Sequence, residues 1–91
     1  MAQAAGRQSI FITGAASGMG RETARLFHQK GWFVGAFDLN LAGLEALQAE
    51  LGADNCVIQT LDVSDKAQFD AAVATFGQAT DGRMDILFNN A

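Results

Sequence analysis

Three glycines that follow an apolar run are the residues best suited to chemistry in this sequence. The run Ile10–Thr13 leads into Gly14, Gly18 and Gly20, and helix-forming residues continue from Arg21 without a spacer. Glycine has no Cβ, so the chain can turn sharply at Gly14 and can approach a ligand closely at Gly18. At Gly20 the missing side chain lets a helix pack against its strand. Because the first N–H groups of that helix lack intrahelical partners, the pattern predicts a pyrophosphate site.

An acidic residue ends the next apolar run. Asp38 closes Trp32–Asp38, 18 residues beyond Gly20, where a carboxylate can accept hydrogen bonds from both hydroxyls of an adenosine ribose. A 2′-phosphate would be repelled there, since two unit charges 4 Å apart interact with about 4 kcal/mol at an effective dielectric of 20. No arginine or lysine occupies 37–42 to offset this. The sequence therefore favours NAD over NADP. Alternatively, Asp38 is a polar strand end or the partner of a helix N-cap.

Polar residues also follow two later apolar runs. Asp62-Val63 ends the run that begins at Cys56, and Asn89-Asn90-Ala91 ends the run that begins at Met84. Buried amides need several hydrogen-bond partners, so paired asparagines at a strand end are expected to tie neighbouring strand ends together. Asp62 has a second interpretation, in which it caps the helix that Ser64 opens.

Strand-like runs alternate with helical patterns along the whole chain. The predicted strands are Ser9–Thr13, Trp32–Asp38, Cys56–Asp62 and Met84–Asn89. The predicted helices are Gly18–Lys30, a second that Asn40 caps and Gly52 ends, and a third that Ser64 or Asp65 caps. This alternation indicates right-handed βαβ crossovers. The predicted fold is α/β, a Rossmann-type doubly wound parallel sheet with strand order 3-2-1-4.

Each predicted helix has an apolar stripe, and the stripe of the first helix is expected to face the sheet. The stripes consist of Gly20, Ala24 and Phe27; of Leu41, Leu44, Leu47 and Leu51; and of Phe69, Ala72, Val73 and Phe76.

The motif Thr13-Gly14-x3-Gly18-x-Gly20, with the later motifs in this order, resembles the short-chain dehydrogenase/reductase family. The resemblance implies that the Asp62 carboxylate binds the adenine amino group and that the Val63 backbone approaches the ring. It also implies that Asn89-Asn90-Ala91 begins an Asn-Asn-Ala-Gly motif beside the cofactor ribose. The residues expected to bind the cofactor are Gly14, Ser17, Gly18, Met19, Gly20, Asp38, Leu39, Asp62, Val63, Asn90 and Ala91.

The resemblance implies an NAD-dependent oxidoreductase that interconverts an alcohol and a ketone or aldehyde by hydride transfer. In the family this step depends on a Tyr-x-x-x-Lys pair, a serine and a further asparagine, but this chain contains no tyrosine. We therefore assign no catalytic residue and interpret 1–91 as the N-terminal part of one Rossmann NAD-binding domain, with the catalytic C-terminal part absent. Two alternatives are a non-catalytic, truncated nucleotide-binding module and a Rossmann protein that binds S-adenosylmethionine. The latter class usually has its acid just before the glycine loop, where Thr13 stands here.

Composition restricts the partners of the protein. Ninety-one residues suffice for one small domain, and a net charge of −4 argues against nucleic acid. No apolar run approaches the roughly 18 residues of a membrane span, so we expect no membrane association and a cytoplasmic location. His28 is the single histidine, so no metal site is expected, and Cys56 is expected to be a small buried hydrophobic residue.

The predicted fourth strand would leave an apolar edge without a partner. We expect the remaining chain or another subunit to cover it, and the intact protein to be a homo-oligomer with a small-molecule alcohol or carbonyl substrate.

Overall fold

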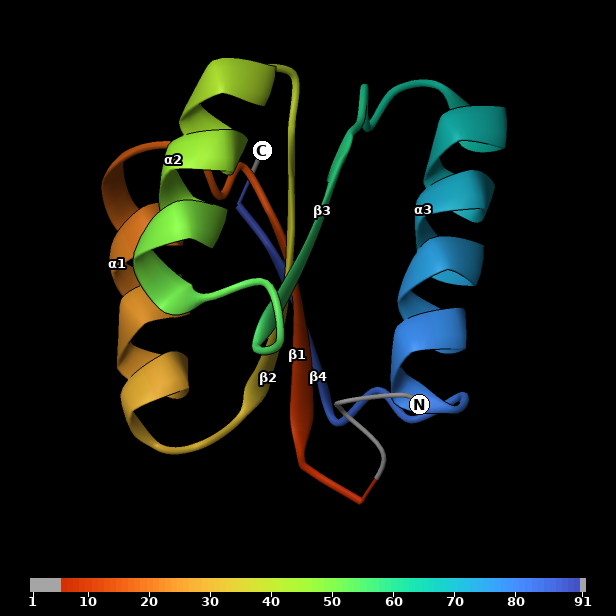
Figure 1. Ribbon diagram of the computed structural model, residues 1–91. Helices are drawn as coiled ribbons and strands as arrows, with labels where there is room; N and C mark the ends of the chain where they lie inside the picture. Colours follow the sequence, from red (N-terminus) through yellow and green to blue (C-terminus); the bar gives the residue numbers. More distant parts are fainter. Residues whose placement is uncertain (1–5, 91) are drawn as a thin grey trace.

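A parallel β-sheet between two helical layers makes up the computed structural model, which describes residues 6–90 (Figure 1). The strands are β1 (Ser9–Thr13), β2 (Phe33–Asp38), β3 (Cys56–Thr60) and β4 (Ile86–Asn89). The helices are α1 (Gly18–Gln29), α2 (Leu41–Leu51) and α3 (Lys66–Thr80). Helices α1 and α2 cover one face of the sheet, and α3 covers the other.

The strand order is β3-β2-β1-β4, and all three strand pairs are parallel. This confirms the predicted Rossmann-type sheet. The chain moves outward from β1 to β3 through α1 and α2, then crosses back through α3 to place β4 on the other side of β1. The direction of winding therefore changes at β1. Open α/β sheets bind ligands at this kind of switch point, beyond the carboxyl ends of the strands.

The core consists of two apolar layers, one on each face of the sheet. Ile10, Ile12 and Val34 pack with α1 and α2, whereas Phe11 and Phe37 pack under α3. Because successive side chains of a strand point to opposite faces, β1 contributes to both layers and is buried throughout. This burial holds the carboxyl end of β1 firmly in place.

Three predicted strands are shorter than expected. The N–H of Trp32 donates to the carbonyl of Phe27 in the last turn of α1, so β2 begins one residue later, at Phe33. The N–H of Asp62 donates to the side chain of Gln68, so β3 ends at Thr60. Likewise, β4 begins at Ile86 rather than Met84. At two of these ends a backbone hydrogen bond to the neighbouring strand still extends one residue beyond the strand: the N–H of Leu61 donates to Asp38, and the N–H of Asp85 donates to Ser9.

The helix caps agree with the sequence pattern. Asn40 caps α2 by accepting from the N–H of Gly43 at 3.1 Å, and Asp65 caps α3 by accepting from the N–H of Gln68 at 3.2 Å. Of the two candidate caps for the third helix, the structure therefore selects Asp65. Gly52 ends α2, as predicted.

The apolar stripes are buried only in part. Leu44, Leu47 and Leu51 of α2 are buried, but Leu41, its first residue, is 47% exposed. In α3, Val73 is 37% exposed, although Ala72 and Phe76 are buried as expected. The buried face of each helix is therefore narrower than its apolar stripe.

The edge of the sheet at β4 is apolar and open. Within residues 6–90, β4 pairs with β1 alone, and Ile86 and Leu87 are 37% and 46% exposed. The open edge agrees with the sequence prediction. In the same part of the chain, no helix has the length and hydropathy of a membrane span.

Candidate functional site

The loop between β1 and α1 turns at two glycines with left-handed backbone. Gly14 has φ 66° and Gly18 has φ 57°, values that other residues adopt only with strain. A Cβ built on Gly18 would meet no atom within 4 Å, so this side of the loop faces open space. The loop thus combines a glycine-dependent conformation with room for a ligand.

Gly20 brings the helix against the loop. A Cβ on Gly20 would lie 2.1 Å from the carbonyl oxygen of Gly14, a distance at which atoms overlap severely. The predicted close packing at this position is therefore confirmed. It places the first turn of α1 directly beside the end of β1.

The N-terminus of α1 lacks the side-chain cap that the other two helices have. Ser17 occupies the N-cap position in extended conformation, but its side chain makes no capping hydrogen bond, and the first turn contains no acidic residue. The first N–H groups of a helix have no intrahelical partners and carry the positive end of the helix dipole. Ser17, Gly18 and Met19 are all exposed here, so this helix end can receive an anion.

The Asp38 carboxylate is held by backbone N–H groups on two sides. One oxygen accepts from the N–H of Ala16 in the loop at 3.0 Å, and the other accepts from the N–H of Asn40 at 3.1 Å. The contact with Asn40, the N-cap of α2, is the one foreseen in the alternative interpretation of Asp38. Acceptor positions on the Asp38 carboxylate remain available after this contact, because a carboxylate offers about four of them. Asp38 can therefore still accept hydrogen bonds from ligand hydroxyls.

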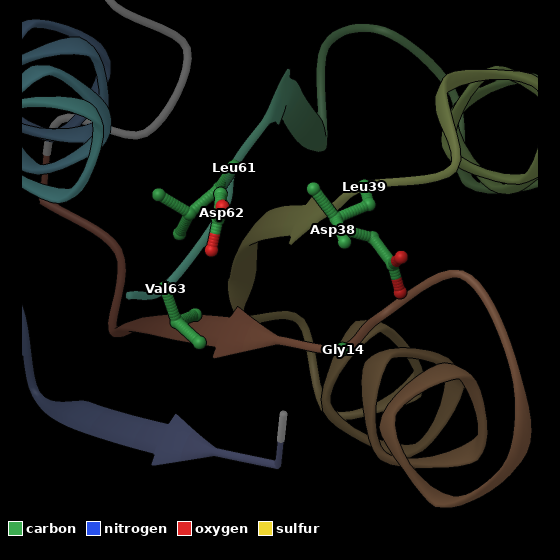
Figure 2. A pocket seen from close by; sticks show the side chains of 6 residues that line it. All are labelled: Gly14, Asp38, Leu39, Leu61, Asp62 and Val63. Carbon is green, nitrogen blue, oxygen red and sulfur yellow. The ribbon is translucent and has the colours of Figure 1, made fainter. Parts of the chain in front are cut away.

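A cavity of about 240 Å³ opens at the carboxyl ends of the strands. It is lined by Gly14, Asp38, Leu39, Leu61, Asp62 and Val63 (Figure 2). In Figure 2 the Asp38 carboxylate points toward the loop that follows Gly14, while Asp62 lies on the far side with Val63. Complete sites for drug-sized ligands span roughly 300–1,000 Å³, so this cavity matches one portion of a ligand, such as a nucleoside.

Asp62 makes local hydrogen bonds at the wall of the cavity. One of its oxygens accepts from the N–H and the hydroxyl of Ser64, at 3.0 and 2.6 Å, and these bonds lower the pKa of the Asp62 carboxyl. Asp65 is the cap of α3, so the interpretation of Asp62 as the helix cap is wrong. The side chain of Gln68 also holds the backbone of Asp62 at 3.0 Å. The loop after β3 is therefore fixed from α3.

The ends of β1 and β4 are joined by a hydroxyl. Thr13 donates to the side-chain oxygen of Asn89 at 2.7 Å and accepts from the N–H of Asn90 at 2.9 Å. The predicted tie between strand ends is confirmed, with Thr13 as its centre. Ala91 lies outside the described residues.

The predicted residues fall into three neighbouring groups. Gly14, Asp38, Leu39, Asp62 and Val63 line the cavity; Ser17, Gly18, Met19 and Gly20 form the start of α1; and Asn90 follows β4.

Sequence reasoning missed two features of this region. Leu61 lines the cavity and was not among the predicted residues, although it directly precedes Asp62. Ala16 holds Asp38 through its backbone, and a backbone donor leaves no side-chain signal in the sequence. Both features depend on how the strand ends are placed in space.

Reactive groups elsewhere show no sign of a second chemistry. Burial raises the pKa of the Cys56 thiol to about 12, which keeps it neutral. No group of three or more His, Cys, Asp or Glu side chains within residues 6–90 could hold a metal ion.

The amino-acid sequence is similar to those of known proteins. Residues 8–91 match the family model described as short chain dehydrogenase. The chain is 44% identical to D-threitol dehydrogenase of Mycolicibacterium smegmatis, over 88% of the chain and 31% of that protein. It is also 44% identical to 2-dehydro-3-deoxy-L-rhamnonate dehydrogenase (NAD(+)) of Sphingomonas sp., over 96% of the chain and 33% of that protein.

A solved structure shows the same likeness in three dimensions. The 3-ketoacyl-(acyl-carrier-protein) reductase of Brucella melitensis, complexed with NADH, superimposes with a TM-score of 0.82 at 35% identity, covering 88% of this chain and 32% of that one. The chain thus spans about a third of the length of the relatives that it matches.

Proposed function

The chain belongs to the short chain dehydrogenase family, and on this premise we propose that it forms the NAD-binding part of an oxidoreductase that interconverts an alcohol and a ketone or aldehyde. The observation that carries the proposal is the cavity between Asp38 and Asp62, which lies next to the uncapped start of α1. One site thus offers hydrogen-bond acceptors for a sugar, room for a base and donors for a diphosphate.

Each part of the dinucleotide has a place in this arrangement. The N-terminus of α1 would hold the pyrophosphate, because Ser17 adds a hydroxyl there and Gly18 leaves open space. Asp38 would accept hydrogen bonds from the hydroxyls of the adenosine ribose. The cavity beside Val63 would hold the adenine, and Asp62 would accept from its amino group.

We infer a preference for NAD over NADP from the charge at this position. Asp38 would face a 2′-phosphate directly, and no arginine or lysine in 37–42 would neutralise it. The names of two relatives support this inference, since one is called an NAD(+) enzyme and the other was solved with NADH.

When bound, the cofactor supplies or accepts the hydride. This chain contributes binding and orientation, which make the transfer close to unimolecular. The Thr13 hydroxyl fixes Asn89 and Asn90 at the end of β4. We assign no catalytic residue here, because the chain contains no tyrosine. The greater length of the relatives supports hydride transfer by further segments of a longer enzyme. The cytoplasmic location and the homo-oligomeric state stay predictions.

Calorimetric titration of the natural protein with NAD, NADP and S-adenosylmethionine tests the proposal. We expect binding of NAD, weaker binding of NADP and none of S-adenosylmethionine. Preference for NADP would contradict the role of Asp38, and exclusive binding of S-adenosylmethionine would reject the oxidoreductase assignment. The intact mass distinguishes the oxidoreductase from the remaining alternative, a truncated nucleotide-binding module. A natural protein of 9.6 kDa that binds NAD but does not transfer hydride would support the module.

A further inference from the structure

We propose that Gly43, in the first turn of α2, is a positioning residue for the cofactor site. Because Gly43 has no side chain, α2 can pack closely against Ala16. This packing keeps the N–H of Ala16 hydrogen-bonded to the Asp38 carboxylate. This inference rests on the proposed function, because it concerns the same ribose-binding carboxylate. Gly43 itself does not line the cavity.

The contact between α2 and the glycine loop leaves no room for a methyl group. A Cβ on Gly43 would lie 2.9 Å from the Cβ of Ala16, 3.0 Å from Nδ2 of Asn40 and 3.3 Å from the Ala16 carbonyl oxygen. The Asn40 amide is the end of a side chain and can shift, whereas the Ala16 atoms cannot. The Ala16 methyl cannot rotate away, since it is attached directly to the backbone and the residue is only 4% exposed. A side chain at 43 would therefore move either the loop or the first turn of α2.

Nothing in the conformation of Gly43 demands glycine. Its φ is not positive, unlike that of Gly14 or Gly18, and it lies inside a regular helix. Glycine is among the poorest helix formers, so it weakens α2 at this position. The close approach to Ala16 is the structural reason for it.

The start of α2 holds one oxygen of Asp38, and the loop residue packed against it holds the other. The N–H of Gly43 donates to the Asn40 side chain at 3.1 Å, and the N–H of Asn40 donates to one Asp38 oxygen at 3.1 Å. The other oxygen accepts from Ala16, which lies against Gly43, at 3.0 Å. Separating Ala16 from α2 would therefore stretch one of the two bonds that orient the carboxylate.

The displacement would be local. The apolar residues Leu44, Leu47 and Leu51 anchor α2 in the core at 0%, 1% and 5% exposure. A shift of the first turn leaves these contacts in place. We thus expect Gly43→Ala to fold and to differ in how it holds Asp38.

The test compares Gly43→Ala with Gly77→Ala in the natural protein. Gly77 is the matched control, since it is also helical and a Cβ there would meet nothing within 4 Å. Without ligand, we expect Gly43→Ala to speed hydrogen exchange at the Ala16 amide about tenfold, the factor for losing about 1.4 kcal/mol of a hydrogen bond to a charged group. NMR would measure this exchange.

Cofactor affinity provides the second readout. We expect Gly43→Ala to weaken NAD binding about tenfold, while NADP binding, which gains nothing from a well-placed carboxylate, changes by less than about twofold. Gly77→Ala should change neither affinity. Adding Ala16→Gly to Gly43→Ala removes the methyl group at the 2.9 Å contact and should restore much of the NAD affinity.

The outcomes separate this inference from the proposed function. A wild-type protein that binds neither dinucleotide rejects the proposed function, while exchange at Ala16 in the ligand-free variants still decides whether Gly43 positions the loop. An unchanged Ala16 exchange rate overturns the positioning role. Equal losses of NAD and NADP affinity, or an unfolded Gly43→Ala that Ala16→Gly does not rescue, also overturn it.

Discussion

At the scale of single residues, Asp38 shows how a carboxylate is oriented before any ligand arrives. Two backbone N–H groups, from Ala16 and Asn40, hold its two oxygens from opposite sides. A side chain that folding has already ordered loses little further freedom when it binds a sugar. Under the proposed function, its negative charge would act on the ligand from a fixed position and favour a hydroxyl over a phosphate.

Replacing Asp38 with asparagine should reverse this preference. Asp38→Asn removes the charge and one acceptor oxygen, so we expect NAD to bind about tenfold more weakly, the loss typical of a hydrogen bond to a charged group. NADP should bind more tightly, because the repulsion of its 2′-phosphate disappears. Calorimetric titration with both dinucleotides measures the two constants.

Asp70→Asn is the control for Asp38→Asn, since it removes the same charge from the exposed face of α3, where Asp70 pairs with Lys66. It should leave both constants unchanged. An NAD-to-NADP ratio that is the same in wild type and Asp38→Asn would contradict the assignment of Asp38.

At the scale of elements, the start of α1 differs from the starts of α2 and α3. Side chains of Asn40 and Asp65 satisfy the first turns of those two helices, whereas Ser17 does not cap α1. Because Gly20 has no side chain, α1 packs closely against the end of β1. The uncapped amides of α1 therefore lie beside the strand ends that line the cavity. The position of this helix, set by one glycine, places its uncapped amides where we propose that the pyrophosphate binds.

Gly20→Ala should destabilise the protein despite a better helix propensity. Alanine improves a helix interior by about 1 kcal/mol over glycine, but a Cβ here would lie 2.1 Å from the Gly14 carbonyl oxygen. Overpacking typically costs about 1–3 kcal/mol, and a backbone oxygen cannot rotate away, so the overlap outweighs the propensity. Thermal unfolding followed by circular dichroism should show a lower Tm.

Gly77→Ala serves again as the comparison, because it introduces the same methyl group into a helix with open space around it. Its Tm should stay the same or rise. A Gly20→Ala variant with a Tm at or above wild type would show that α1 can move away from the loop without loss.

At the scale of the whole molecule, side chains fasten both ends of the β1–β4 pair. At the carboxyl end, Thr13 joins Asn89 and Asn90. At the opposite end, Asp85 accepts from the N–H of Ser9 at 2.8 Å and from the Arg83 guanidinium at 2.9 Å. These contacts join β1 to β4, whose contacting residues lie 76 or 77 positions apart in the sequence.

The Asp85 contacts make global stability depend on pH. The Arg83 guanidinium, followed by the N–H of Ser9, holds the pKa of the Asp85 carboxyl below its usual value. Since the folded pKa lies below the unfolded one, this contribution is complete above pH of about 4, the ordinary pKa of aspartate, and is lost as pH falls through the folded pKa. We therefore expect the free energy of unfolding to fall less between pH 6 and pH 3 in Asp85→Asn than in wild type.

Urea unfolding at the two pH values measures this difference. Asp62 and Glu50, whose carboxyl pKa values are also lowered, stay in both proteins and cancel in the comparison. An Asp85→Asn protein with the same pH dependence as wild type would show that the Asp85 contacts add no stability.

The sequence alone determined the features that depend on neighbours in the chain. The glycine loop, the Asn40 cap and the alternation of strands and helices follow from local stereochemistry and periodicity. The strand order was predicted from the Rossmann-type pattern of the glycine loop and this alternation. The cavity residues Asp38 and Val63 were predictable for a similar reason, since parallel strands end at the same edge of the sheet.

The tertiary structure alone decided which of these groups touch. Ala16 donates to Asp38 across 22 residues, Asn90 donates to Thr13 across 77, and Gly43 lies against Ala16. The exposure of Leu41 and Val73 was decided in the same way, by which face of each helix meets the sheet. Such contacts depend on distances of a few ångströms between packed elements, and no local pattern encodes those distances because the whole core sets them.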